Sequence, residues 1–188
     1  MANTEVSTQG RLITGEELAQ MADLGSCELI DGRIVPMTPT GGRHGWIELN
    51  FSRALDEFVR SRHLGKVLTG EVGIFTQRNP DRVRAADVLF VSNETYARQT
   101  DPQGYLDVAP DLVVEILSPS DRAMDTIQKL REYFVIGVKI VWVADPAART
   151  VYVYRSVTDV REFRENDRLQ GDHVLPGFDV PVASLFEE

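Results

Sequence analysis

The sequence has almost no cysteine and no long hydrophobic run. Cys27 is the only cysteine among the 188 residues, which excludes an intrachain disulfide and a metal site built from cysteines. The most apolar stretch, Tyr133 to Val143, is short and is interrupted by Lys139, so we expect no membrane-spanning helix. The first ten residues, MANTEVSTQG, lack the basic and apolar parts of a signal peptide, and together these absences predict a cytoplasmic protein.

Basic residues are also scarce relative to acids. The chain has 20 Lys and Arg against 29 Asp and Glu, a formal net charge of -9. Proteins that coat nucleic acid usually present a basic surface, because neutralising phosphates dominates their affinity, so this class is disfavoured. An enzyme that contacts DNA only locally stays open, since a group of carboxylates can itself belong to a metal site.

The hydrophobic fraction, 43 %, is that of an ordinary globular protein of this length. We expect a flexible tail over residues 1–12 and a single domain over residues 13–188. Apolar spacing and turn signals predict helices, strands and one two-residue hairpin turn at Asp31-Gly32. The expected helices are 14–24, 43–62 and one that follows 118–121; the expected strands are 28–30, 33–35, 66–76, 83–91, 111–117, 139–145 and 150–155. Residues 170–186 are expected to return over the core as irregular structure.

Two acids stand inside segments that otherwise look like buried strands. Alternation places Asp87 on the same face as Leu89, and Glu115 on the same face as Val113 and Leu117. A carboxylate among apolar neighbours is costly unless it is paired, hydrogen-bonded or bound to a metal. Two such groups on adjacent strands suit a cation between them, and oxygen ligands favour Mg²⁺ or Mn²⁺ over zinc.

The helix after Glu115 supplies a cation. Lys129 lies off the apolar stripe of that helix, where a long side chain can reach the end of the strand. A lysine beside a bound metal can orient or deprotonate the attacking water and offset the charge that develops on a phosphate.

Simpler interpretations stay open for each residue taken alone. A strand Asp or Glu is often a solvated edge residue, and Lys129 would pair with Asp125 one helical turn earlier. His44 and His63 are interpreted as helix-end or surface histidines. Asp111 is less suitable than Asp87 as the partner of Glu115, because four residues of strand separate alpha carbons by ~13 Å.

Five segments occur in the order seen in one family: CELIDGRI (27–34), RAADVLFV (84–91), APDLVVEILSPSDR (109–122), KLREYFVIGVKIVWVADP (129–146) and VLPGFDV (174–180). Over residues 14 to 186 the chain resembles the Uma-two family of restriction endonucleases, in the PD-(D/E)XK nuclease superfamily. The resemblance implies an α/β fold, a restriction-endonuclease-like mixed β-sheet flanked by helices. It also implies a Mg²⁺-dependent endonuclease (or one using Mn²⁺) that hydrolyses DNA, with a homodimer as the expected assembly.

Carried over by position, the resemblance implies that Asp87, Glu115 and Lys129 are catalytic. The implied metal ligands are Asp87, Glu115, the Ile116 backbone carbonyl and Glu28. Two departures are visible: Leu117 stands where the superfamily usually has its lysine, and Ala86 replaces the proline usual before the first acid. The lysine is instead Lys129 on the following helix, as in the Uma-two pattern.

Two other function classes stay open. The chain could be a catalytically inactive module that keeps the nuclease fold for interactions, in which case the acids are paired structurally. A sugar-acting hydrolase using Asp87 and Glu115 as a carboxylate pair ranks lower, because nothing in the sequence specifies a sugar site. Divalent metal separates the first alternative from the nuclease, since only the nuclease should gain stability from Mg²⁺ or Mn²⁺.

Overall fold

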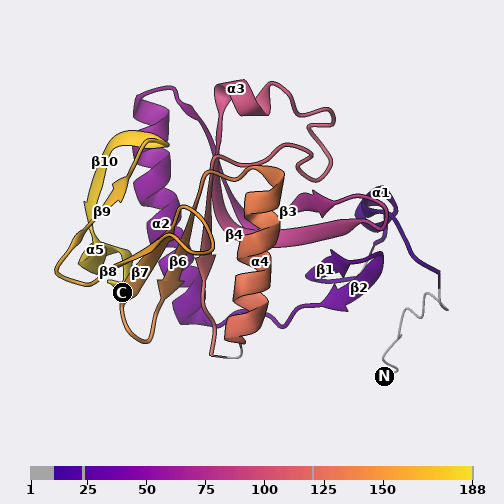
Figure 1. The fold of residues 1–188 in the computed structure, drawn as a ribbon, viewed down its shortest axis with the longest axis horizontal. Coiled ribbons are helices and arrows are strands. Elements are labelled where there is room, and N and C mark those ends of the chain that lie inside the picture. Colours follow the sequence, from indigo (N-terminus) through magenta and orange to yellow (C-terminus); the bar gives the residue numbers. More distant parts are fainter. Residues whose placement is uncertain (1–10, 23, 120, 188) are drawn as a thin grey trace.

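A mixed β-sheet runs through the protein, between helix α2 (Gly42–Ser61) and helix α4 (Ala123–Ile136) (Figure 1). The computed structural model describes residues 11–22, 24–119 and 121–187, so most of the predicted tail, residues 1–10, lies outside the described residues. The sheet has eight strands in the described part of the chain, in the order β2-β1-β4-β5-β6-β7-β8, with β3 paired to β4. The strands are β1 (Cys27–Ile30), β2 (Arg33–Pro36), β3 (Gly65–Gln77), β4 (Arg82–Ser92), β5 (Leu112–Ile116), β6 (Ile140–Asp145), β7 (Thr150–Tyr154) and β8 (Val160–Phe163).

The connection through α4 explains why the sheet is mixed. β5 and β6 are parallel, because α4 carries the chain back along the sheet between them. The other neighbouring strands are antiparallel. The predicted α/β fold, a mixed sheet flanked by helices, is therefore confirmed.

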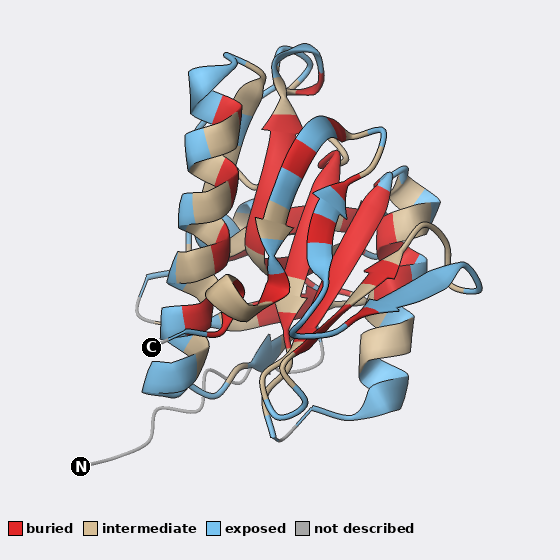
Figure 2. Cartoon of the chain, turned by 90° about the vertical axis from the view of Figure 1, so that its left-hand side faces the viewer, coloured by how far each residue is buried: buried red, intermediate tan, exposed pale blue. Residues whose placement is uncertain are grey.

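The sheet separates two apolar cores. On one side, α2 presents a stripe at helical spacing that is completely or almost completely buried: Ile47, Phe51, Leu55 and Val59. On the other side, α4 contributes Leu130 and Tyr133 to a second cluster with the alternate strand residues. Figure 2 shows this division, with buried strands between helices that are buried only along one stripe. Both helices are thus fixed against the central strands that carry Asp87 and Glu115.

The C-terminal segment packs over the core on the α2 side, as predicted, but it is not irregular. It forms a hairpin, β9 (Arg168–Gly171) and β10 (Leu175–Pro181), followed by helix α5 (Val182–Leu185). Pairing is interrupted between Leu175 and Asp179, the segment that contains Pro176 and Gly177. These two residues carry the irregular signal in the sequence, whereas the flanking residues pair normally.

The N-terminal elements match the prediction in kind but not in length. Helix α1 (Gly15–Ala19) begins with the expected capping box of Thr14 and Glu17, yet it ends five residues before the predicted Leu24. The turn at Asp31-Gly32 joins β1 and β2, and both residues have positive φ, 51° and 74°.

A short helix, α3 (Asn93–Tyr96), follows β4. None of the helices in the described residues has the length and apolar character needed to cross a membrane.

A matched pair of glycine substitutions tests this packing. In Gly65→Ala the new Cβ would lie 2.1 Å from the Val91 carbonyl oxygen, a backbone atom of the paired strand that cannot move aside easily. We expect a loss of about 1–3 kcal/mol in the free energy of unfolding. Gly45→Ala, inside α2 with nothing within 4 Å of the new Cβ, should instead gain about 0.5–1 kcal/mol. Urea denaturation of both variants measures the difference, and equal stabilities would contradict the strand register.

Candidate metal and catalytic site

Asp87 and Glu115 lie where strands β4 and β5 stop pairing. The last pair in this direction is Val88 with Val114, so the next positions outward are Asp87 and Glu115. The Asp87 carboxylate accepts the backbone N–H of Ile116 at 2.7 Å, in place of a strand-to-strand hydrogen bond. The side chains of Asp87 and Glu115 are only 13 % and 12 % exposed. The interpretation of these acids as solvated edge residues is therefore wrong.

A bulge in β3 interrupts the regular alternation beside Asp87. Thr69 pairs with Val88 and Val72 pairs with Ala86, so Gly70 and Glu71 together face Asp87. Ala86 and Leu89 both pack into the core on the α4 side although they are three residues apart. The simple period-two prediction of the face of Asp87 fails for this reason, and its carboxylate lies at the junction of the two strands.

Glu115 is held by two residues of helix α4. Its Oε2 lies 2.9 Å from Nζ of Lys129, and its Oε1 accepts the Tyr133 hydroxyl at 2.6 Å. Burial raises the pKa of Glu115 to about 7, with the charge of Lys129 opposing this shift and that of Asp87 adding to it. The pKa of the Tyr133 hydroxyl is also raised, by burial and by the charge of Glu115. The contacts to Lys129 and Tyr133 show that the Glu115 side chain points toward α4, the face predicted from the alternation of residues along its strand.

Lys129 has three oxygen atoms around its ammonium group. Nζ donates to the Ala85 carbonyl at 3.0 Å and to Glu115, and Oε1 of Glu28 lies 3.4 Å away. Burial works against the charge on Lys129, but the carboxylates of Glu115 and Glu28 more than offset it, so its pKa lies above the ordinary value. Lys129 is thus not a solvated lysine paired with Asp125, and the alternative interpretation is wrong.

Glu28 reaches the same group from strand β1 and belongs to a buried charge network. Its oxygens accept the Ala85 N–H at 3.1 Å and Nη1 of Arg84 at 2.7 Å. Arg84 also donates two hydrogen bonds to Glu132, at 2.6 and 2.9 Å, and Arg82 donates another to Glu132 at 2.6 Å. Each buried acid of this network thus has a cation beside it, which is the condition for burying charge at tolerable cost.

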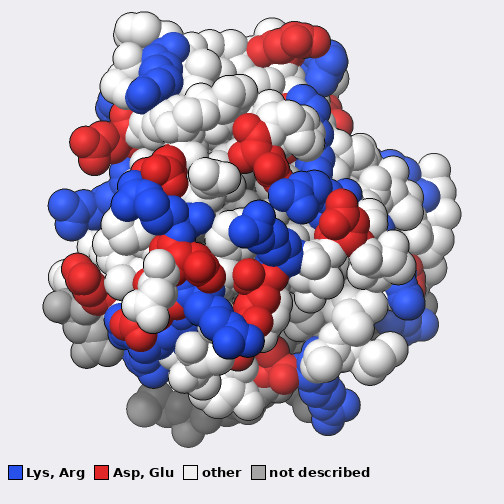
Figure 3. Space-filling view, turned by 60° about the vertical axis from the view of Figure 1, so that its left-hand side comes forward, with Lys and Arg blue, Asp and Glu red and all other residues white. Residues whose placement is uncertain are grey.

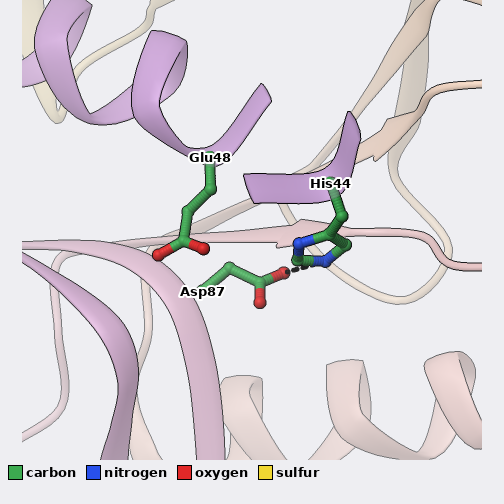
Figure 4. Close-up of side chains that lie close together, drawn as sticks. All are labelled: His44, Glu48 and Asp87. Atoms are coloured by element: carbon green, nitrogen blue, oxygen red, sulfur yellow. Dashed lines mark ion pairs between the residues drawn. The ribbon is translucent and has the colours of Figure 1, made fainter. Parts of the chain in front are cut away.

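Helix α2 brings two further side chains toward Asp87 (Figure 4). His44 and Glu48 are four residues apart, so they share one face of the helix. The ligating atoms of His44, Glu48 and Asp87 lie within 4.8 Å of one another, close enough for one metal ion. His44 Nε2 is 3.0 Å from the Ile116 carbonyl oxygen and 3.5 Å from Asp87. Its hydrogen bond to Asp87 raises the pKa of His44.

His44 is in the first turn of α2, as expected of a helix-end histidine, but its side chain is only 10 % exposed. The surface interpretation is wrong for His44, whereas His63 is exposed beyond the end of α2. The sequence signal that could have found the group is the spacing of His44 and Glu48 beside the buried Ile47. This spacing involves only two residues. The third member of the group, Asp87, is 43 positions away from His44 in the sequence.

A polar cavity of about 240 Å³ joins these residues. It is lined by His44, Asp87, Glu115, Ile116 and Lys129, and also by Glu71 from the bulge. Asp111, the acid rejected as a partner of Glu115, instead pairs with Lys139 at 2.6 Å. The cavity therefore collects carboxylate, carbonyl and imidazole donors, a set that fits a divalent cation such as Mg²⁺ or Mn²⁺.

The outer surface offers no single-sign field on the face shown in Figure 3. Lys and Arg side chains are interspersed there with Asp and Glu. Ion pairs among the described residues include Arg155–Asp172 and Arg149–Glu165, both with contacts of 2.6 Å. These pairs contribute no net charge, so the net charge of -9 comes from the excess of 29 acids over 20 basic residues.

The raised pKa of Glu115 predicts a specific pH dependence of stability in the metal-free protein. A carboxyl that binds its proton more tightly when folded loses stability as pH rises from its ordinary pKa, 4.5, to about 7. Relative to Glu115→Gln, which cannot ionise, the wild type should therefore lose about 3 kcal/mol over this range and change little above it. Denaturation of both proteins from pH 4.5 to 8 measures this. If the stability of the wild type relative to Glu115→Gln instead rises with pH, the charge of Lys129 outweighs the effect of burial on the pKa of Glu115.

Comparisons with known proteins agree with this fold. The solved structure of "a putative nuclease belonging to DUF820 from Anabaena variabilis ATCC 29413" superposes with a TM-score of 0.77. The match covers 93 % of this chain and 97 % of that chain at 20 % sequence identity, a level that establishes the shared fold alone. A search of curated proteins finds no match. The model of the Uma2 family, described as "Putative restriction endonuclease", matches residues 16–183. The chain belongs to the Uma2 family.

Proposed function

We propose that the protein is a divalent-metal-dependent endonuclease that hydrolyses phosphodiester bonds of DNA. The observation that carries the proposal is the convergence of Asp87, Glu115 and the Ile116 carbonyl on one cavity, with Lys129 behind Glu115. Membership of a family described as restriction endonucleases supports the same reaction class. The acids and the lysine are also the residues that the PD-(D/E)XK pattern selects, although the lysine comes from a helix.

Asp87, Glu115 and the Ile116 carbonyl are proposed to hold Mg²⁺ or Mn²⁺. A bound ion would polarise the scissile phosphate and lower the pKa of a water molecule. Asp87 also belongs to the group of His44, Glu48 and Asp87 that could hold one metal ion, so it is a ligand in both arrangements. His44 Nε2, from a residue that also lines the cavity, lies 3.0 Å from the Ile116 carbonyl oxygen.

Lys129 is proposed to position Glu115 and to offset negative charge at the cavity. Its three oxygen neighbours favour this role over direct contact with the attacking water, the other role expected from the sequence. Glu28 is proposed to hold Lys129 in place, because Arg84 and the Ala85 N–H already engage both its oxygens. These contacts favour positioning over the ligand role that the resemblance implies for Glu28.

Metal binding should appear as thermal stabilisation. Mg²⁺ or Mn²⁺ at 100 times its dissociation constant should stabilise the folded wild type by about 2.7 kcal/mol. Asp87→Asn should abolish this gain, because the amide keeps an acceptor for the Ile116 N–H but loses the charge that binds a cation. Asp159→Asn, an exposed carboxylate on the turn before β8, is the matched control and should keep the full gain. Equal melting shifts in the two variants would remove Asp87 from the metal site.

Cleavage of supercoiled plasmid tests the reaction itself. The wild type should cut with Mn²⁺ or Mg²⁺ and not with EDTA, while Glu115→Gln and Lys129→Met should each be slower by about 100-fold or more. Glu57→Gln, on the exposed face of α2, should cut like the wild type. Linear product without prior nicking would support the expected homodimer. Folded wild type that neither cuts nor gains stability from metal would favour the interaction module.

A further inference from the structure

We propose that Glu71 is the carboxylate that orients the attacking water and takes its proton. This proposal rests on the proposed nuclease function and adds a residue that no motif in the sequence indicates. It is drawn from the position of Glu71 in the cavity and from the hydrogen bonds that already engage the other candidate bases.

The bulge in β3 delivers Glu71 to the site. Because Thr69 and Val72 pair with Val88 and Ala86, two residues of β3, Gly70 and Glu71, face the single residue Asp87. Glu71 therefore lies on the strand beside Asp87, and the two side chains start from neighbouring backbone positions. The side chain of Glu71 then lines the same cavity as Asp87, Glu115 and Lys129.

The backbone at Glu71 is unusual for its residue type. Its φ is +59°, next to Gly70 at +92°. Glycine adopts this conformation freely, whereas a side chain with a Cβ atom does so at a cost. Glycine or asparagine would therefore suit the backbone better, and stability of the bulge does not account for a glutamate at this position.

Glu71 differs from the other acids of the cavity in its contacts. Asp87 accepts the Ile116 N–H, and Glu115 is held by Lys129 and Tyr133. In the described part of the chain, no hydrogen-bond donor or cation contacts the Glu71 carboxylate, which is only partly exposed. Its oxygens are thus available to a water molecule in the cavity without breaking an existing contact.

Each of the other candidate bases already has a contact on at least one of its polar atoms. Lys129 has three oxygens around its ammonium group, and a cation of raised pKa is not a base. His44 directs Nε2 to the Ile116 carbonyl, and its Nδ1 is completely buried. Glu48 accepts the Gly70 N–H at 3.1 Å and the Thr69 hydroxyl, both with Oε1, and it does not line the cavity. Asp121, the remaining acid of the cavity, accepts the Ser118 N–H at 2.7 Å. Among the acids that line the cavity in the described residues, Glu71 alone has no such contact, which favours it as the group that accepts a proton from water.

The reaction balances with water alone as co-reactant. The water oxygen forms a bond to phosphorus as one of its protons passes to a Glu71 oxygen. The bond from phosphorus to the leaving sugar oxygen breaks, and that oxygen takes a proton from solvent. Glu71 then returns its proton to solvent, so the net change is one phosphodiester and one water converted to a phosphomonoester and an alcohol.

Glu71→Gln tests the role with little change in shape. We expect single-turnover cleavage of a DNA duplex to fall by 100-fold or more, the usual worth of a general base. Two other quantities should stay at wild-type values: the Mn²⁺ concentration that gives half of the thermal shift, and DNA affinity measured in Ca²⁺. A merely structural role, or a role as a metal ligand, would move one of them. Glu57→Gln, at an exposed position of α2, controls for the loss of one negative charge.

Glu71→Gly separates chemistry from stability. Because glycine relaxes the positive φ, the variant should melt no lower than the wild type while cutting as slowly as Glu71→Gln. Cleavage by Glu71→Gln at the wild-type rate, with Glu115→Gln inactive, would overturn the role of Glu71 and leave the nuclease function standing. Wild type that does not cut DNA, with Mn²⁺ binding intact, would instead overturn the proposed function.

Discussion

The ion pair between Lys129 and Glu115 is the interaction on which the rest of the site depends. It joins helix α4 to the end of strand β5, at the point where β4 and β5 separate. Two acids that line one cavity repel each other, and burial makes their charges more costly. A cation supplied from the helix behind them allows both to remain there without a metal ion.

The same constraint explains the layers of charge below the cavity. Arg84 forms ion pairs with both Glu28 and Glu132, and Arg82 forms a further ion pair with Glu132. Pairing of this kind seldom adds much net stability, because each ion has lost its water, but removal of one member leaves the others uncompensated. The network therefore acts as a rigid support that fixes the positions of Lys129 and Glu115 relative to the sheet.

Much of this arrangement could be predicted from the sequence, because it depends on local patterns. The strand acids Asp87 and Glu115 stand out against apolar neighbours, and Lys129 stands off the stripe of its helix. The structure brings these three to one place. The positions of His44, Glu48 and Glu71 could not be predicted in this way. His44 and Glu48 depend on how α2 crosses the sheet, and Glu71 depends on a bulge whose register is set by pairing with β4.

The central claim is that Asp87 and Glu115 share a metal ion, and anomalous diffraction from crystals soaked in Mn²⁺ tests it most directly. The claim predicts one strong anomalous peak within bonding distance of both carboxylates and of the Ile116 carbonyl oxygen. A peak bound by His44, Glu48 and Asp87, with Glu115 still paired to Lys129, would contradict it. So would Mn²⁺ found only on surface carboxylates.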